Sequence, residues 1–121
     1  DRVALVMNVC PFTSEYKYPE YRAIRTKQYT YARTPEGASK LFDNLKDPYQ
    51  MNNLVDKSEF ADLQQELNQR LNQQLANIGD DFQRRDYYLQ KWNVRLDESR
   101  KAINYWDFNK GTGLVQSPGI N

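Results

Sequence analysis

Histidine is absent from the 121-residue sequence, although it is the side chain that most often serves as a general base or a metal ligand near neutral pH. Most hydrolase mechanisms therefore lose their usual central group here. The 16 Asp and Glu residues are mixed with 17 Lys and Arg, as on a solvated surface. The spacing of the Asp and Glu residues does not support a small enzyme that uses a carboxylate pair. We therefore predict no catalytic residue in this chain.

Cysteine is almost as scarce, because Cys10 is the one cysteine and has no partner for an internal disulfide. Without a histidine or a second cysteine it cannot complete a zinc site, and we predict no metal site. No apolar run approaches the roughly 20 residues that span a bilayer. A net charge of +1 gives no basic field for a nucleic-acid backbone. The sequence therefore predicts no membrane span and no nucleic-acid partner.

Four short segments have the composition of strands. Residues 3–9 form a continuous apolar run that is rich in β-branched side chains. Further along, the apolar phase is even at Ile24 and odd at Tyr29 and Tyr31, which predicts two strands joined near residues 26–28. A turn with Pro and Gly at residues 34–37 then separates the third strand from a fourth. The predicted strands are residues 3–9, 21–26, 28–33 and 39–43.

After residue 55 the apolar spacing changes to three or four residues, at Phe60, Leu63, Leu67, Leu71, Leu75 and Ile78. This spacing predicts one helix over residues 57–78, with a capping box formed by Asp56 and Glu59 and a left-handed C-terminal cap at Gly79. The predicted fold is α+β, with a small antiparallel sheet of about four strands packed against one long helix. Residues 1–80 form this core, and residues 81–121 form a short helix or ordered loop and an irregular, aromatic-rich tail.

Three motifs follow one another along this core. They are Arg22-Ala23-Ile24-Arg25-Thr26-Lys27-Gln28-Tyr29-Thr30-Tyr31, then Leu41-Phe42-Asp43-Asn44, then Lys46-Asp47-Pro48-Tyr49-Gln50-Met51-Asn52-Asn53-Leu54. Together they resemble the C-terminal subdomain of the arylsulfatase-like type I sulfatases, a family that includes bacterial members. In that family R-A-I-R-T, Y-x-Y and L-Y-D-L-x-x-D-P-x-E-x-x-N-L precede one long helix. Such a long composite pattern seldom arises by chance. Gln50 departs from it, because an acidic residue is common at this position.

The resemblance implies a full-length enzyme that hydrolyses sulfate esters with a formylglycine and a calcium-type cation, both in an alkaline-phosphatase-like domain. The formylglycine arises from the first residue of a C/S-x-P-x-R motif. Cys10 does not fit this motif, because Pro11 comes one position early, Phe12 takes the place of the proline and Ser14 that of the arginine. We therefore expect this chain to be inactive alone and to hold no cofactor. The implied role is structural, at the rim of the substrate cleft, with the catalytic domain of the same polypeptide as partner and a periplasmic or secreted location.

Arg22 and Arg25 are the candidate substrate-binding residues, because a guanidinium group can bind the sulfate or carboxylate of a polysaccharide bidentately. The alternative for each arginine is an ion pair with a neighbouring acid or packing along the sheet. Four tyrosines are further candidates, either for stacking on sugar rings or for packing in the sheet: Tyr16, Tyr18, Tyr29 and Tyr31.

A different class of function is also compatible with the composition. The 9 Tyr, 2 Trp and 5 Phe could form the platform of an independent carbohydrate- or protein-binding module. A subdomain without its catalytic neighbour should expose an apolar patch and could self-associate through it. Binding of a sulfated carbohydrate by the chain alone would favour the independent module.

Overall fold

The computed structural model describes residues 2–9 and 20–94. The chain divides into two compact units, of which unit 1 contains residues 1–8 and 21–82 and unit 2 contains residues 9–20 and 83–121. Cys10, Tyr16, Tyr18 and the predicted tail after residue 94 lie outside the described residues, so the expectations for them stay predictions.

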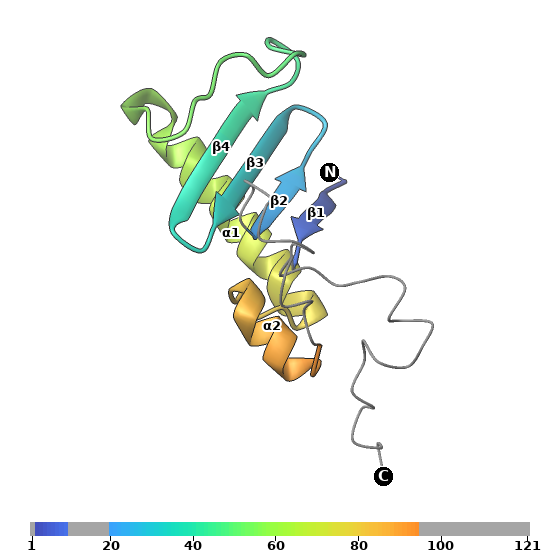
Figure 1. Ribbon diagram of the computed structural model, residues 1–121. Coiled ribbons are helices and arrows are strands. Elements are labelled where there is room, and N and C mark those ends of the chain that lie inside the picture. The colour runs from blue at the N-terminus through green and yellow to red at the C-terminus, as the bar shows by residue number, and fades with distance from the viewer. Residues whose placement is uncertain (1, 10–19, 95–121) are drawn as a thin grey trace. The chain divides into compact units, whose positions relative to one another are not determined.

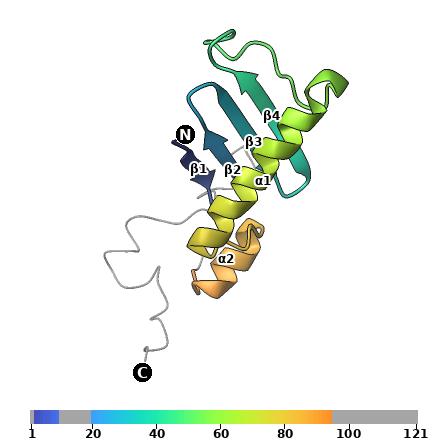
Figure 2. The ribbon, with the colours of Figure 1, turned by 180° about the vertical axis from the view of Figure 1, so that it is seen from behind.

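Unit 1 contains a four-stranded antiparallel sheet in the order β1-β2-β3-β4, which confirms the predicted meander. The strands are β1 (Ala4–Asn8), β2 (Tyr21–Arg25), β3 (Tyr29–Thr34) and β4 (Gly37–Asp43). One long helix, α1 (Ala61–Ile78), crosses one face of the sheet, as Figures 1 and 2 show from opposite sides. The predicted α+β class, with a small sheet and one long helix, is therefore confirmed.

A threonine forms the turn between β2 and β3, where the sequence offers no glycine. The Thr26 hydroxyl oxygen accepts the N–H groups of Gln28 at 3.2 Å and Tyr29 at 2.8 Å. The Thr26 N–H in turn donates to the Tyr29 carbonyl at 2.9 Å. These bonds replace the usual hairpin turn chemistry. They also set the register in which Ile24 lies opposite Tyr31, so that both side chains face α1.

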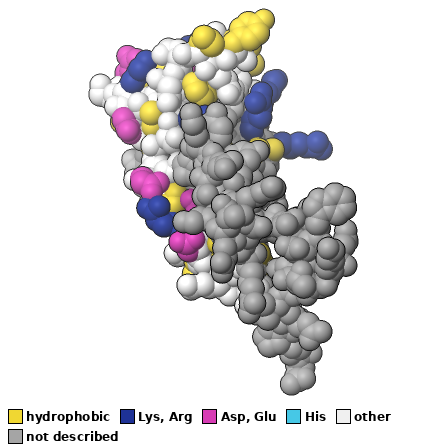
Figure 3. Space-filling model, in the orientation of Figure 1, with side chains coloured by type: hydrophobic (Ala, Val, Ile, Leu, Met, Phe, Trp, Pro, Cys, Tyr) yellow, Lys and Arg dark blue, Asp and Glu magenta, His cyan; other side chains and the backbone are white. Residues whose placement is uncertain are grey.

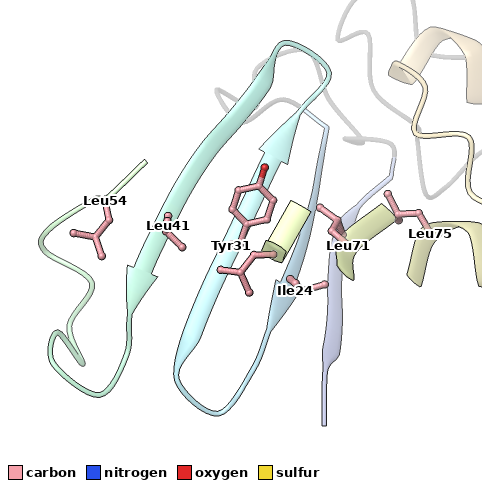
Figure 4. Packing of buried hydrophobic residues seen from close by; sticks show 7 residues of the cluster. Ile24, Tyr31, Leu41, Leu54, Leu71 and Leu75 are labelled. Atoms are coloured by element: carbon pink, nitrogen blue, oxygen red, sulfur yellow. The ribbon is translucent and has the colours of Figure 1, made fainter. Parts of the chain in front are cut away.

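The buried core lies between the sheet and α1 (Figure 4). Its members are Ile24, Tyr31, Leu41, Leu54, Leu67, Leu71 and Leu75. The three helical leucines are four residues apart and form one stripe. Ile24, Tyr31 and Leu41 lie opposite one another on neighbouring strands, on the face of the sheet that α1 covers. Ile24, Leu41 and Leu71 are each 0% exposed, so apolar burial holds the helix on the sheet.

At the N-terminal end of α1 the structure differs from the predicted cap, whereas at the C-terminal end it agrees with it. A 3-10 turn, η1 (Ser58–Phe60), precedes the helix, and no side chain caps either element. The predicted capping box is wrong, because Asp56 instead bonds to Gln64, donating its N–H at 2.8 Å and accepting the side-chain amide at 2.9 Å. The cap predicted at Gly79 is confirmed by its φ of 66° and by the 2.9 Å bond from the next N–H to the Leu75 carbonyl.

Unit 2 contains a short helix, α2 (Arg85–Lys91), which is one of the two alternatives predicted for this segment. The Glu20 carboxylate accepts the N–H of its first residue. Tyr88 is buried, and its ring contacts Tyr87 edge-on at 5.2 Å and Trp92 at 5.1 Å between centroids. These three aromatic side chains form one cluster on α2 and at its C-terminal end.

Candidate functional site

Arg22, the first predicted substrate-binding residue, faces α1 and is 0% exposed. Its guanidinium donates to both carboxylate oxygens of Asp80, at 2.5 Å and 3.1 Å. It also donates to the Asn8 and Tyr21 carbonyls, each at 3.1 Å, and lies 4.7 Å from the centre of the Phe82 ring. The charge of Arg22 therefore binds the end of α1 to strands β1 and β2.

Arg25, the second predicted residue, is exposed and points to the opposite face, because it lies three positions further along the same strand. Next to it is an open hollow of about 650 Å³, lined by Arg2, Val3, Ala4, Arg25, Thr26 and Lys27. Figure 3 shows Lys and Arg side chains that project from this edge of unit 1. We call Arg2, Arg25 and Lys27 the basic edge; no acidic residue is among the described residues that line the hollow. This surface can attract an anionic ligand.

Tyr29 and Tyr31 take the packing role rather than the sugar-stacking role. Tyr31 is 2% exposed, and its hydroxyl donates to the Asn68 side-chain oxygen at 3.2 Å. Burial raises the pKa of Tyr31. The positive charge of Arg33 acts to lower this pKa and the negative charge of Asp56 acts to raise it, but burial is the largest effect. The phenol thus stays protonated and keeps donating its hydrogen bond. Tyr29 is half-buried and packs against the same core.

Two aspartates fold the segment that follows β4. The Asp43 carboxylate accepts the N–H groups of residues 45 and 46, at 3.1 Å and 3.2 Å. The Asp47 carboxylate accepts those of residues 51 and 52, at 3.0 Å and 2.7 Å. Each carboxylate satisfies backbone donors that no regular element pairs. Asp47 of the D-P-x-x-x-x-N-L motif is therefore a residue that shapes the backbone.

Asn53, the asparagine of the same motif, covers the outer edge of β4. Its side-chain oxygen accepts the Leu41 N–H at 2.9 Å, and its side-chain amide donates to the Ser39 carbonyl at 3.0 Å. The neighbouring Leu54 donates its N–H to the Leu41 carbonyl at 2.8 Å and places its side chain in the core. The resemblance identified this motif, but only the structure shows that it joins the loop to the sheet.

Gln50, which departs from the sulfatase pattern, has a positive φ of 55°. Its side-chain amide donates to the Asn44 side-chain oxygen at 2.8 Å and to the Thr30 hydroxyl at 3.2 Å. The Thr30 hydroxyl donates to the same Asn44 oxygen at 3.0 Å. These three side chains connect the loop to β3, so the uncharged residue at position 50 is matched by polar neighbours.

The interior carboxylates of unit 1 already have partners, since Asp43 accepts backbone N–H groups and Asp80 binds Arg22. Within residues 2–9 and 20–94, no three His, Cys, Asp or Glu side chains are close enough together to hold a metal ion. In the same ranges no helix has the length and apolar character to cross a bilayer.

Comparison with known proteins gives one curated relative of high identity. Over 118 residues the chain is 60% identical to an ulvan-active sulfatase of Formosa agariphila, a match that covers 98% of this chain and 23% of that protein. No protein-family model matches the chain.

Two solved structures share the fold over 67% of this chain and 17% of their own. One, from Bacteroides fragilis and assigned as a sulfatase, has a TM-score of 0.52 at 31% identity. The other, solved with its substrate D-glucosamine-2-N,6-O-disulfate, has a TM-score of 0.54 at 24% identity and shows the fold alone. The predicted resemblance to a sulfatase subdomain is confirmed, and the chain spans 23% of the length of its curated relative.

Proposed function

We propose that this chain is the C-terminal subdomain of a sulfatase, a sulfuric ester hydrolase, and that it supports the catalytic domain of the same polypeptide without being active alone. The observation that carries the proposal is the 60% identity, which extends over 98% of this chain but over only 23% of the relative. In this proposal the formylglycine and the calcium ion that the resemblance implies belong to the catalytic domain.

The roles of the motif residues support a structural function. Arg22 binds Asp80 inside unit 1, Asp47 folds the loop after β4, and Asn53 joins that loop to the sheet. Each of these side chains uses its polar atoms within the chain. The result is a rigid sheet and helix whose turns can be held at the rim of a substrate cleft.

Substrate contact at that rim falls to the basic edge of Arg2, Arg25 and Lys27. A sulfated sugar carries the anionic groups that arginine binds bidentately. One relative is named for ulvan and another structure contains a disulfated glucosamine, which supports this ligand class. Arg25 is the exposed member of the predicted pair, whereas Arg22 would act by holding β2 in place; direct contact by Arg22 stays a prediction.

Hydrolysis of an aryl sulfate tests the main proposal. The 121-residue chain with calcium added should show no turnover, whereas the complete gene product should hydrolyse the ester and should contain a C/S-x-P-x-R segment outside this chain. Turnover by the chain alone would refute the proposal, and so would a complete gene product without sulfatase activity.

A variant of the complete gene product tests the basic edge. Arg25→Ala should raise KM for a sulfated oligosaccharide and leave kcat nearly unchanged, because the lost contact lies away from the reacting ester. Lys40→Ala is the matched control, since Lys40 is an exposed cation of β4 outside the hollow. Equal KM values for the two variants would contradict the role of Arg25.

A second candidate function rests on unit 2. Tyr87 and Trp92 are 40% and 48% exposed, and the Lys91 ammonium lies 5.4 Å from the centre of the Tyr87 ring. Exposed aromatic rings beside a cation are suited to stacking on an anionic sugar. Titration of the chain with sulfated oligosaccharides, followed by tryptophan fluorescence, tests this. Saturable binding that Tyr87→Ala removes, with Trp92 kept as the fluorescent reporter, would favour an independent binding module.

A further inference from the structure

Three large apolar side chains are exposed on one loop of unit 1. Between β4 and η1, Leu45 is 63% exposed, Tyr49 86% and Met51 85%. Figure 3 shows hydrophobic side chains projecting at the end of unit 1 where this loop lies. We call these three side chains the apolar loop. Single exposed apolar residues are common on protein surfaces, but a group of large ones indicates a contact surface.

Hydrogen bonds to two aspartates support the backbone that carries these side chains. The Asp43 carboxylate accepts the N–H of Leu45, and the Asp47 carboxylate accepts that of Met51. The N–H of Gln50 donates to the Asp47 carbonyl at 3.0 Å, directly after Tyr49. These bonds reduce the backbone ordering that binding of a partner would require, which lowers the entropic cost of binding. Tyrosine and methionine are also enriched in the centres of interfaces.

We propose that the apolar loop docks into an apolar pocket on the catalytic domain of the same sulfatase polypeptide. This inference rests on the proposed function and names the surface through which the subdomain is held. Most of the length of the curated relative lies outside the matched segment, which spans 23% of it. The sequence that would form the pocket is therefore available in a protein of that kind.

The size of the apolar loop favours this partner over a second copy of the chain. Three such side chains bury on the order of 400 Å² when fully covered, since one aromatic side chain buries about 150–250 Å². A stable complex of separate proteins needs roughly 800 Å² from each partner. Within one polypeptide the linkage supplies an effective concentration of about a millimolar, so a small contact is enough.

Oxidation of the two methionines by hydrogen peroxide tests the proposal with mass spectrometry as the readout. Met51 is exposed in the loop, whereas Met7 is half-buried on β1 and serves as an internal reference. Because oxidation follows exposure, Met51 should react at least about tenfold more slowly in the complete gene product than in the 121-residue chain. Met7 reports any general change in the fold.

Substitution of the loop gives a second, independent measurement. Tyr49→Ser with Met51→Ser should leave the thermal midpoint of the 121-residue chain nearly unchanged, because both side chains are exposed there. The same pair should lower the midpoint of the complete gene product by several degrees and increase tryptic cleavage after Lys46, an exposed residue of the same loop that the variant leaves in place. Ile78→Ser is the control, since Ile78 is 57% exposed at the end of α1 and should alter neither protein.

The possible failures can be told apart. If the complete gene product hydrolyses an aryl sulfate but its Met51 oxidises as fast as in the isolated chain, the docking proposal is overturned and the proposed function stands. If the gene product has no sulfatase activity, the proposed function itself fails. If Met51 of the isolated chain becomes protected as concentration rises, the partner is a second copy, and the docking proposal is also overturned.

Discussion

The core beneath α1 and the loop after β4 are both well defined, but different forces define them. The core depends on apolar surface such as that of Ile24 and Leu71, which carries no directional requirement. The loop depends on particular oxygen and nitrogen atoms of Asp47 and Asn53. Several apolar residues can fill a core of given volume, whereas few side chains can make the loop bonds. The sulfatase-like signature is therefore easiest to read in the loop.

Arg22 and Asp80 combine both situations, because they form a charged contact inside the apolar region. Their side chains are 0% and 8% exposed. Burying both charges costs solvation free energy, which the mutual attraction and the carbonyl bonds to Arg22 offset. Substitution of this pair therefore tests how strongly the stability of unit 1 depends on specific polar partners.

Removal of one partner of this pair should have the largest effect. Asp80→Ala leaves the buried guanidinium of Arg22 without its carboxylate and should lower the free energy of unfolding by about 3–5 kcal/mol, measured by urea denaturation. The double variant Arg22→Met, Asp80→Leu should recover most of that loss, since apolar residues of similar size can replace a buried pair. A loss below about 1 kcal/mol in Asp80→Ala would show that solvent reaches the pair.

Truncation in the core should have the next largest effect. Leu71→Ala creates a cavity between α1 and the sheet and should cost about 2–5 kcal/mol in the same denaturation experiment. The control Ile78→Ala lies on the same helix but is 57% exposed, and it should cost well under 1 kcal/mol. Similar losses for the two variants would mean that the helix is not held by the core described above.

Loss of the Asn53 side chain should have a moderate and local effect. Asn53→Ala leaves the Leu41 N–H without its acceptor and should cost about 1–2 kcal/mol. Hydrogen exchange of the Leu41 amide should become faster, while the amides of α1 should exchange at unchanged rates. Asn52→Ala is the control, because that side chain accepts only an exposed bond from Lys57, at 3.0 Å. A uniform change across unit 1 would argue against a local role.

The smallest effect should come from the protonation of Asp43. Burial acts to raise its pKa, but hydrogen bonds from Gln28 and from the N–H groups of residues 45 and 46, with the charge of Lys46, outweigh burial and lower the pKa. The stabilisation is therefore fully present above the unfolded-state value of about 3.9 and is lost as the pH falls through the lower folded-state value. Unfolding measured between pH 2 and about 6 should show this decline. Asp43→Asn should reduce the slope.

The sequence predicted those parts of the fold that depend on periodicity. The change of phase between Ile24 and Tyr29 located the hairpin, and the leucine spacing located α1, because a buried face must repeat with the period of its element. Gly79 was predictable for a related reason, since a left-handed cap strongly favours glycine.

The parts that the sequence did not predict depend on contacts between distant residues or on exposure. Arg22 meets an acid 58 residues away, and no local pattern contains that distance. The carboxylate of Asp56 had two possible partners, the N–H groups of the first turn or the side chain of Gln64, and only the three-dimensional path of the loop decides between them. The sequence did not predict the exposure of Tyr49 and Met51, because large apolar residues are ordinarily expected in the protein interior.

The side chain of Asn53 has a consequence for the behaviour of the chain in concentrated solution. An unpaired strand edge offers backbone groups to other molecules and can start sheet extension and aggregation. At β4 the Leu41 N–H and the Ser39 carbonyl are already occupied by the asparagine. A foreign strand would first have to displace it, so this side of the sheet resists the addition of further strands, and a single amide group protects the protein from fibre-like growth in that direction.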